Sequence, residues 1–377
     1  MKDVFVVADN IISPVGGTTA VNFDALKQNI SGVQEHLLPA FSPVPFQASL
    51  LPEETYTGVA GIDGSFTKFE TLLLLSIRQA LQNSGIDVQS TRTILVISST
   101  KGNISLLEAA GIPARDKIGL SASAKKIALF FGLANTPLVI SNACISGLTA
   151  LLTGKRLLQM GQYDHAIVAG ADIISEFILS GFQSFQAISA QPCRPFDASR
   201  NGINLGEAAA TVILSVTAGK KELRLSGGAI TNDANHISGP SRSGQELCIA
   251  IKKAMQQAGV TAPDIGFIAG HGTATLYNDE MEAKAFSLAG MQTVPVNSLK
   301  GYYGHTLGAA GIIESVIALQ SMQQQLMIGT RGFNQPGVSM PINVCKQTMP
   351  LGSNHCLKTA SGFGGCNAAL VFSKTTV

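Results

Sequence analysis

Apolar residues along the chain fall into short runs, typical of buried strands, that alternate with longer stretches of helical spacing. In the first part of the chain the pattern predicts strands at 4–8, 94–98, 138–140, 166–169 and 208–215. It predicts helices at 19–28, 69–83 and 121–131, and a further Ala/Leu-rich helix after residue 144. Strands that alternate with helices favour a layered α/β fold.

A second series of elements begins at Leu223, after the charged pair Lys220-Lys221. Its predicted strands are 265–269 and 294–297, and its predicted helices are 245–257, 281–288 and 308–324. Two further apolar segments, 342–345 and 368–373, close the chain. Residues 36–66 and 181–202 show no clean period, so we expect a surface crossing and an ordered loop there. Because the order of elements is similar in both parts, we predict two duplicated halves, 1–216 and 217–377.

Composition narrows the class of protein further. Hydrophobic residues make up 45% of the chain and charged residues 13%, which indicates an extensive core. The net charge of +2 favours neither a nucleic-acid nor a membrane-surface partner. The six cysteines are scattered without metal-ligand or disulfide spacing. We therefore expect a reduced, cytoplasmic enzyme without a secretory signal or membrane span, and without a dinucleotide or Walker A motif.

Cys144 lies where a strand gives way to a helix. The apolar run 138–140 stops at a small polar turn, and Gly147 follows the cysteine within an Ala/Leu-rich stretch. A thiol at this position lies next to unpaired N–H groups at the positive end of the helix dipole, which lowers a thiol pKa. The alternative is an inert buried cysteine, the usual fate of a free cysteine. The pattern alone leaves both open.

Two glycine-rich turns carry further reactive side chains. His271 ends a predicted buried strand, and Lys300 and His305 flank a second turn that precedes the helix carrying Glu314. Each has a simpler alternative, a structural histidine or a solvated lysine. Together, a cysteine, two histidines and a lysine suit acyl transfer to a thiolate, followed by decarboxylation to a carbanion. That chemistry requires no metal and no organic cofactor.

The sequence resembles the β-ketoacyl-acyl carrier protein synthases of the elongating Cys-His-His class over nearly its whole length. The matching motifs are NACISG at 142–147, RPFDASRNGINLGEAA at 194–209, NDANHISGP at 232–240, HGTAT at 271–275 with Asp279 and Glu282, KGYYGHTLGAAG at 300–311, and GFGGCNAALVF at 362–372. The resemblance implies a thiolase-like five-layer αβαβα fold built from two duplicated halves. It also implies a homodimer, or a heterodimer with another ketosynthase-like chain, that works with acyl carrier protein.

By this resemblance, Cys144 accepts the acyl group and His271 and His305 assist decarboxylation of the malonyl unit. Lys300, paired with Glu314, orients His305. Backbone N–H groups of Cys144 and Phe363 hold the oxyanion. Phe363 also matches a gating phenylalanine, with Phe182 as its partner near the acyl tunnel. Thr273 and Thr275 are expected to bind substrate.

Departures from the family pattern concern acyl specificity. Residues 99–120 look truncated, and Ala208, Leu276, Asn278 and Ser361 replace the residues usual at their positions. These changes suggest a specialised pathway, such as aryl polyene or polyketide-like assembly, instead of housekeeping fatty-acid elongation.

Two other functions stay open from the sequence. One is a chain-length-determining partner subunit, although such partners usually lose the cysteine. The other is a thiolase, for which Cys366 would be a second catalytic cysteine; we interpret Cys366 as structural. Lys68 is a candidate for a basic patch that docks the acidic carrier protein.

Overall fold

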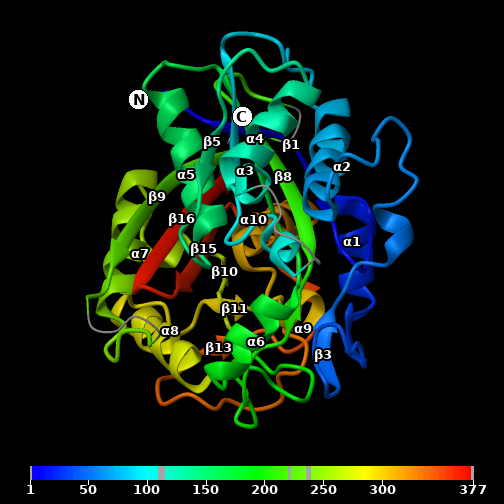
Figure 1. The fold of residues 1–377 in the computed structure, drawn as a ribbon. Coiled ribbons are helices and arrows are strands. Elements are labelled where there is room, and N and C mark those ends of the chain that lie inside the picture. The colour runs from blue at the N-terminus through cyan, green and yellow to red at the C-terminus, as the bar shows by residue number, and fades with distance from the viewer. Residues whose placement is uncertain (1, 109–114, 220–221, 235–238, 375–377) are drawn as a thin grey trace.

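The computed structural model describes residues 2–108, 115–219, 222–234 and 239–374 (Figure 1). Eleven strands form one large sheet in the order β13-β11-β10-β15-β16-β9-β1-β8-β6-β4-β5. Its first-half strands are β1 (Phe5–Ile12), β4 (Thr93–Ser98), β5 (Leu138–Ile140), β6 (His165–Asp172) and β8 (Ala208–Ser215). Its second-half strands are β9 (Leu223–Asn232), β10 (Phe267–Ala269), β11 (Pro295–Asn297), β13 (Asn343–Val344), β15 (His355–Gly362) and β16 (Cys366–Lys374).

Ten α-helices and two small sheets complete the described part of the chain. The helices are α1 (Thr19–Lys27), α2 (Lys68–Gln82), α3 (Arg115–Ile118), α4 (Leu120–Phe130), α5 (Ser146–Gln159), α6 (Glu176–Ser184), α7 (Gln245–Ala258), α8 (Leu276–Leu288), α9 (Lys300–Tyr303) and α10 (Ala310–Gln324). The small sheets join β2 (Val33–His36), β3 (Phe46–Ser49) and β7 (Leu205–Gly206), and β12 (Leu326–Met327) and β14 (Met349–Pro350).

The two halves repeat one topology. The order β5-β4-β6-β8-β1 in the first half corresponds to β11-β10-β15-β16-β9 in the second. The pairing directions also agree, since the outer pairs of each set are parallel and the inner pairs antiparallel. Antiparallel pairing of β1 with β9 joins the halves. The predicted duplication is confirmed, whereas the boundaries 1–216 and 217–377 stay a prediction.

The two halves of the large sheet are separate layers, and helices between them and outside them complete a stack of five layers. Helices α5 and α10 contact each other, and each contacts strands of both halves, so they form the central layer. Strand residues alternate between faces: Val168 packs with this layer, whereas Ile167 and Ala169 pack with the cluster around α2. In the second half Leu357 packs with the cluster around α7 and α8. Strands buried on both faces explain the continuous apolar runs of the sequence.

The central layer requires small residues where its helices cross. A Cβ atom on Gly147 would lie 2.9 Å from the backbone nitrogen of Ile312, and one on Gly311 would lie 2.8 Å from that of Leu148. Any side chain would push α5 and α10 apart, because such separations are shorter than van der Waals contact. This close approach brings the turns that precede both helices together.

Several sequence predictions need correction. Residues 36–66, predicted to be irregular, contain β3, and α6 extends into the predicted loop 181–202. Strand β15 was not predicted at all, because Lys358, Thr359 and Ser361 interrupt its apolar pattern. Within the described residues, no helix combines the length and the apolar character needed to cross a membrane.

Candidate active site

Cys144 lies on the tight turn between β5 and α5. Ala143 has a φ of 44°, a strained value for a residue with a Cβ atom. Two hydrogen bonds brace the turn: the Asn142 N–H donates to Ser146 Oγ (2.8 Å), and that hydroxyl donates to the Ala143 carbonyl (2.6 Å). The turn therefore holds the buried thiol just before the first residue of α5.

The two histidines come from different turns of the second half. His271 follows β10, where Glu282 accepts the N–H groups of His271 (2.8 Å) and Gly272 (2.6 Å). His305 lies between α9 and α10, and its own N–H donates to the Asn204 carbonyl (2.7 Å). Both histidines are buried. These hydrogen bonds hold the backbone of each histidine, while Nδ1 of His271 and both ring nitrogens of His305 have no hydrogen-bond partner among the described residues.

Cys144, His271 and His305 converge on one point. The Cys144 sulfur and one ring nitrogen of each histidine all lie within 4.8 Å of one another. The duplicated topology explains the meeting, because the β5–α5 turn and the β11–α10 segment are equivalent positions of the two halves. Thiolate and imidazole also bind zinc, so these residues could hold a metal ion. The absence of a metal therefore stays a prediction.

Lys300 and Glu314 form a buried ion pair near the histidines, as the resemblance implies. Sequence reasoning missed a second lysine, Lys358 on β15, whose Nζ lies 2.8 Å from the other carboxylate oxygen of Glu314. No periodic or motif signal pointed to Lys358, because it precedes the glycine-rich motif at 362–372. Only the pairing of β15 beside β10 brings it to the site.

The thiol does not have the low pKa that the strand-to-helix turn suggested. Burial raises the pKa of Cys144 to about 12, and a hydrogen bond from Phe363 and the Lys300 ammonium oppose this effect without overcoming it. Cys144 does lie at the N-terminal end of α5, but the removal of water from a buried thiolate raises the thiol pKa by more than the helix dipole lowers it. The resting nucleophile is therefore a neutral thiol.

Both imidazoles are neutral as well. Burial holds the pKa of His271 well below its usual range, and Lys300, His305 and Lys358 lower it further. Burial likewise holds the pKa of His305 well below its usual range, with contributions from Lys300 and Lys358. Neutral imidazoles can donate N–H hydrogen bonds to a developing enolate.

Phe363 connects the nucleophile to an aromatic cluster. Its ring stacks on Phe182 with centroids 5.8 Å apart, and Phe185, which the sequence did not single out, lies 5.4 Å from it. Thr273 and Thr275 share a hydrogen bond between their hydroxyls (2.9 Å). Thr275 also caps α8, so part of its role is structural.

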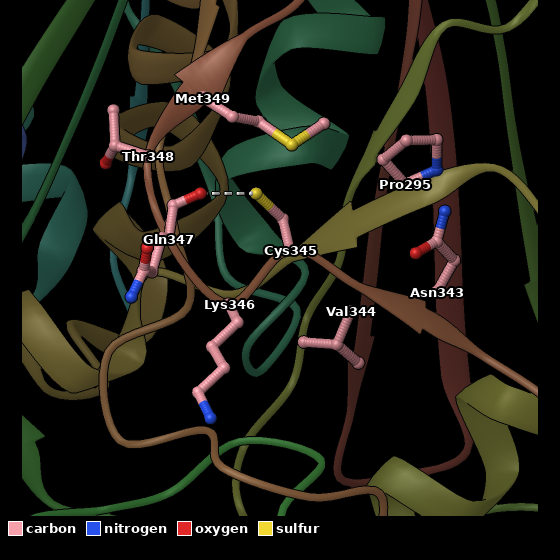
Figure 2. A pocket seen from close by; sticks show the side chains of 8 residues that line it. All are labelled: Pro295, Asn343, Val344, Cys345, Lys346, Gln347, Thr348 and Met349. Atoms are coloured by element: carbon pink, nitrogen blue, oxygen red, sulfur yellow. Dashed lines mark hydrogen bonds between the residues drawn. The ribbon is translucent and has the colours of Figure 1, made fainter.

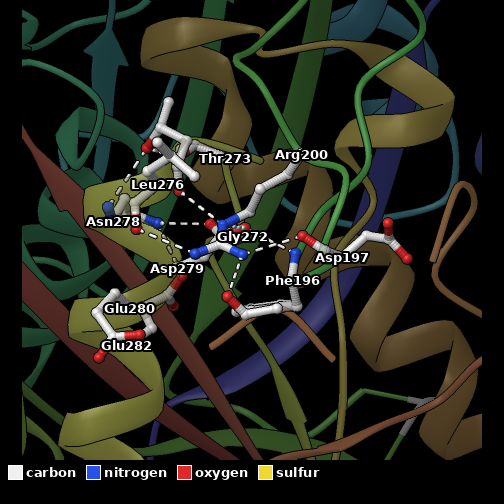
Figure 3. A network of polar contacts seen from close by, with 12 residues as sticks. Phe196, Asp197, Arg200, Gly272, Thr273, Leu276, Asn278, Asp279, Glu280 and Glu282 are labelled. Carbon is white, nitrogen blue, oxygen red and sulfur yellow. Dashed lines mark hydrogen bonds and ion pairs between the residues drawn. The ribbon is translucent and has the colours of Figure 1, made fainter. Parts of the chain in front are cut away.

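The motif at 194–209 packs against the start of α8 (Figure 3). Asp279 accepts the Phe196 N–H (2.7 Å), and the Arg200 guanidinium donates to the Thr275 carbonyl (3.3 Å). Burial raises the pKa of Asp279 to about 7. Asn278, a departure from the family pattern, donates to Glu282 (3.0 Å). This network holds α8, and with it Glu282, against the backbone of His271.

Other sequence candidates lie away from this centre or outside the described residues. Lys68 is engaged by Glu207 (2.6 Å) and the Tyr56 ring (4.7 Å), which makes it a poor docking residue. Cys366 donates to the Phe363 carbonyl (3.3 Å), in keeping with a structural role. In the 232–240 motif, residues 235–238 lie outside the described residues, as do 109–114 of the segment predicted to be truncated.

An open hollow of about 570 Å³ lies elsewhere on the surface (Figure 2). Pro295 and residues 343–349 line it, where β11, β13 and β14 meet. None of the residues that form the reactive centre borders it, so we do not assign it to the chemistry.

Comparisons with known proteins agree with the fold and indicate the family. The family models described as Beta-ketoacyl synthase, N-terminal domain, and Beta-ketoacyl synthase, C-terminal domain, match residues 61–218 and 224–334. A 3-oxoacyl-[acyl-carrier-protein] synthase 2 of Vibrio cholerae is 28% identical, and one of Vibrio harveyi is 27% identical, each with 99% of both chains covered. The Vibrio cholerae alignment runs over 414 positions, more than this chain's 377 residues, so that relative carries insertions.

Solved structures show the same fold. A β-ketoacyl synthase from Burkholderia phymatum superposes with a TM-score of 0.89 at 21% identity, with 100% of both chains covered. A chain from the complex of a ketosynthase with its chain length factor, from Xenorhabdus doucetiae, superposes with a TM-score of 0.85 at 24% identity. The match covers 99% of this chain and 98% of that one. Fold and site thus define a condensing enzyme with a Cys-His-His centre on a thiolase-like fold. The chain belongs to the β-ketoacyl synthase family.

Proposed function

We propose that this protein catalyses a decarboxylative Claisen condensation between an acyl group on Cys144 and malonyl-acyl carrier protein. The observation that carries this proposal is the convergence of Cys144, His271 and His305 within 4.8 Å. The buried Lys300–Glu314 pair behind them supports it. The product is a β-ketoacyl-carrier protein, and the substrates arrive on phosphopantetheine, so no further cofactor is needed.

The first step transfers the acyl group. The Cys144 sulfur attacks the thioester carbonyl, the C–S bond to phosphopantetheine breaks, and the Cys144 proton passes to the departing sulfur. Because the resting thiol is neutral, a nearby imidazole must accept that proton in passing. N–H groups of Cys144 and Phe363 would hold the oxyanion; the Phe363 N–H already contacts the sulfur.

The second step makes the carbon nucleophile. The bond between the malonyl carboxylate and its methylene breaks, carbon dioxide leaves, and the electron pair forms an enolate whose oxygen accepts hydrogen bonds from His271 and His305. The methylene carbon then attacks the acyl group on Cys144. Collapse of the tetrahedral intermediate releases the Cys144 thiolate, which takes up a proton to restore the resting enzyme.

Acyl carrier protein and a second ketosynthase-like chain are the partners we propose. Strand β5 lies at the edge of the large sheet, and Leu138 on it is 38% exposed, as expected where a second chain would add. The Xenorhabdus doucetiae structure is a complex of this kind. A homodimer and a heterodimer both fit this edge.

The acyl chain and cellular location are further proposals. We propose a specialised polyene or polyketide-like pathway, because the aromatic cluster at Phe363 includes a residue, Phe185, beyond the expected pair. Turnover of aryl-polyene primers over saturated aliphatic ones would support it. We propose a cytoplasmic location, because all six cysteines are free.

Purified protein tests the reaction. We expect wild type to form an acyl adduct and a β-ketoacyl product with malonyl-carrier protein, and Cys144→Ala to lose both. Cys366→Ala is the matched control and should keep condensation, whereas a thiolase with two catalytic cysteines would lose it. If folded wild type condenses no primer alone but does so with a second ketosynthase-like chain, the partner-subunit function replaces this proposal.

A further inference from the structure

Lys358 is a fully buried lysine whose contacts lead to His271. Its Nζ donates to the carbonyl oxygens of Ala269 and Gly270, both at 3.1 Å, and to that of Thr359 at 2.6 Å. In the parallel ladder of β10 and β15, Lys358 lies beside Ala269. Lys358 therefore holds the two residues that immediately precede His271.

The fourth partner of Lys358 leads to the other histidine. Its Nζ lies 2.8 Å from one carboxylate oxygen of Glu314, and Lys300 binds the other oxygen. Lys300 is the first residue of α9, the short helix that leads into His305. Glu314 is thus a bridge between the two lysines, and the lysines lie behind the two histidine-bearing turns.

Stability alone does not account for a lysine at this position. An ionised side chain without water is costly to bury, and a buried ion pair is often no more stabilising than apolar residues of similar volume. Burial lowers the pKa of Lys358, while Glu314 acts in the opposite direction. The neighbouring β15 residues Cys356 and Leu357 are buried without charge.

We propose that Lys358 is a positioning residue for the decarboxylation step, fixing His271 relative to His305 through Glu314 and favouring their neutral forms by its charge. The inference rests on the proposed function, because it assigns a role within the same reaction. It adds a residue outside the Cys-His-His centre and the Lys300–Glu314 pair. Lys358 does not touch the reacting atoms and acts through the histidines.

The charge of Lys358 should shift the pKa values of the two histidines in a defined direction. Lys300 and Lys358 both lower the pKa of His271 and of His305, in addition to the effect of burial. Removing the Lys358 charge should therefore raise both pKa values. Three other titratable groups lie next to the pair or to the two lysines and remain in place: Cys144, Glu282, which accepts the His271 N–H, and Glu314 between the lysines. Beyond them lie Asp172 and Cys366 near Cys144, and Asp279 near Glu282.

Two substitutions distinguish the effect of the Lys358 charge from the effect of its hydrogen bonds. Lys358→Met removes the charge and the donated hydrogen bonds, whereas Lys358→Gln removes the charge and keeps an N–H donor. Lys155→Met is the matched control, because Lys155 is a buried lysine on α5 whose charged neighbours are Arg156 and Asp3. The assays are acyl transfer to Cys144 and malonyl-carrier decarboxylation, both followed against pH.

At neutral pH we expect Lys358→Met to slow decarboxylation about tenfold, because the two residues before His271 lose the hydrogen bonds that hold them and small misplacements of a catalytic group are costly. Lys358→Gln should slow it less, because it keeps an N–H donor. In both variants the acidic limb of the decarboxylation profile should move to higher pH. Acyl transfer should fall less than decarboxylation, because it needs one imidazole as a passing base, whereas the enolate accepts hydrogen bonds from both histidines. Lys155→Met should leave both rates and the pH profile unchanged.

A second measurement is independent of catalysis. In protein labelled with ¹³C at histidine Cε1, the signals of His271 and His305 among the six histidines are assigned with His271→Gln and His305→Gln. We expect both signals to titrate at higher pH in the Lys358 variants. If wild type shows no decarboxylation, the proposed function fails while this titration still tests Lys358.

The role would be overturned by equal losses of acyl transfer and decarboxylation with an unchanged pH profile and unchanged histidine titrations. That result would make Lys358 a structural residue only. If Lys358→Met does not fold, Lys358→Gln carries the same two measurements, and unshifted histidine signals in it overturn the electrostatic role.

Discussion

The imidazole rings of His271 and His305 meet edge to face, with their centroids 5.3 Å apart. Two imidazolium cations at this separation would repel each other strongly in a buried site, so neutral rings are favoured. The nearby Lys300 and Lys358 ammonium groups act in the same direction. The pair is thus arranged to donate hydrogen bonds to an anion.

The pH dependence of decarboxylation follows from this arrangement. Because the pKa values of His271 and His305 lie well below 6.5, both rings stay neutral at a pH where an exposed histidine is half protonated. We expect the decarboxylation rate to stay level from about pH 8 down to about pH 6 and to fall only in more acid buffer. Stopped-flow assays, with circular dichroism to verify folding, would test this. Half-maximal loss near pH 6.5 or above would contradict it.

Phe182→Ala should alter acyl selection without abolishing acyl transfer. The substitution removes the ring that stacks on Phe363, a contact worth about 0.5–1.5 kcal/mol. We expect a several-fold change in the relative rates for short and long acyl-carrier primers, measured in competition by mass spectrometry. Phe177→Ala, at an exposed position of the same helix, is the control and should leave the ratio unchanged. An unchanged ratio in both variants would exclude a gating role for Phe182.

Gly147→Ala should destabilise the protein and slow condensation. The new Cβ atom would lie 2.9 Å from the Ile312 nitrogen, so α5 and α10 would have to separate. Overpacking of this kind costs about 1–3 kcal/mol of unfolding free energy. Gly181→Ala, where nothing lies within 4 Å, should be neutral or slightly stabilising. Denaturant titration of both variants measures the difference, and equal stabilities would refute close helix packing.

Asp279→Asn should change how stability depends on pH. The pKa of Asp279 is raised by burial from 3.8 to about 7, so the folded state holds a proton that the unfolded state has already lost. Wild type should therefore lose stability as pH rises from about 4 to about 7, by a few kcal/mol at most. Asp279→Asn lacks this loss, so its stability relative to wild type should rise across that window and level off above it.

An exposed carboxylate, Asp264, is a control for which stability should depend on pH in the opposite direction. The pKa of Asp264 is lowered by hydrogen bonds from Thr261, so its contribution is present above pH 3.8 and lost in acid. The stability of Asp264→Asn should therefore fall below that of wild type as pH rises through the acid range. Urea unfolding of the three proteins at several pH values measures both slopes. Parallel curves for wild type and Asp279→Asn would mean that Asp279 is ionised in the folded state.

Local sequence patterns were sufficient where a strand or helix is both regular and continuously apolar. The strand at 208–215 has the predicted limits, and α2 begins within one residue of its prediction. Cys144 was also placed correctly, since a short apolar run followed by small polar residues marks a turn locally.

The order of the elements and the reactive residue types at their ends could be predicted from the amino-acid sequence, because both depend on neighbours in the chain. Which of these residues meet, and how they ionise, depends on the tertiary structure. It brought Cys144, His271 and His305 together through the contact of α5 with α10, and it placed Lys358 beside Ala269 by pairing β15 with β10. Burial then kept the Cys144 thiol protonated, against the local expectation, because desolvation depends on everything packed around a group and not on the residues next to it.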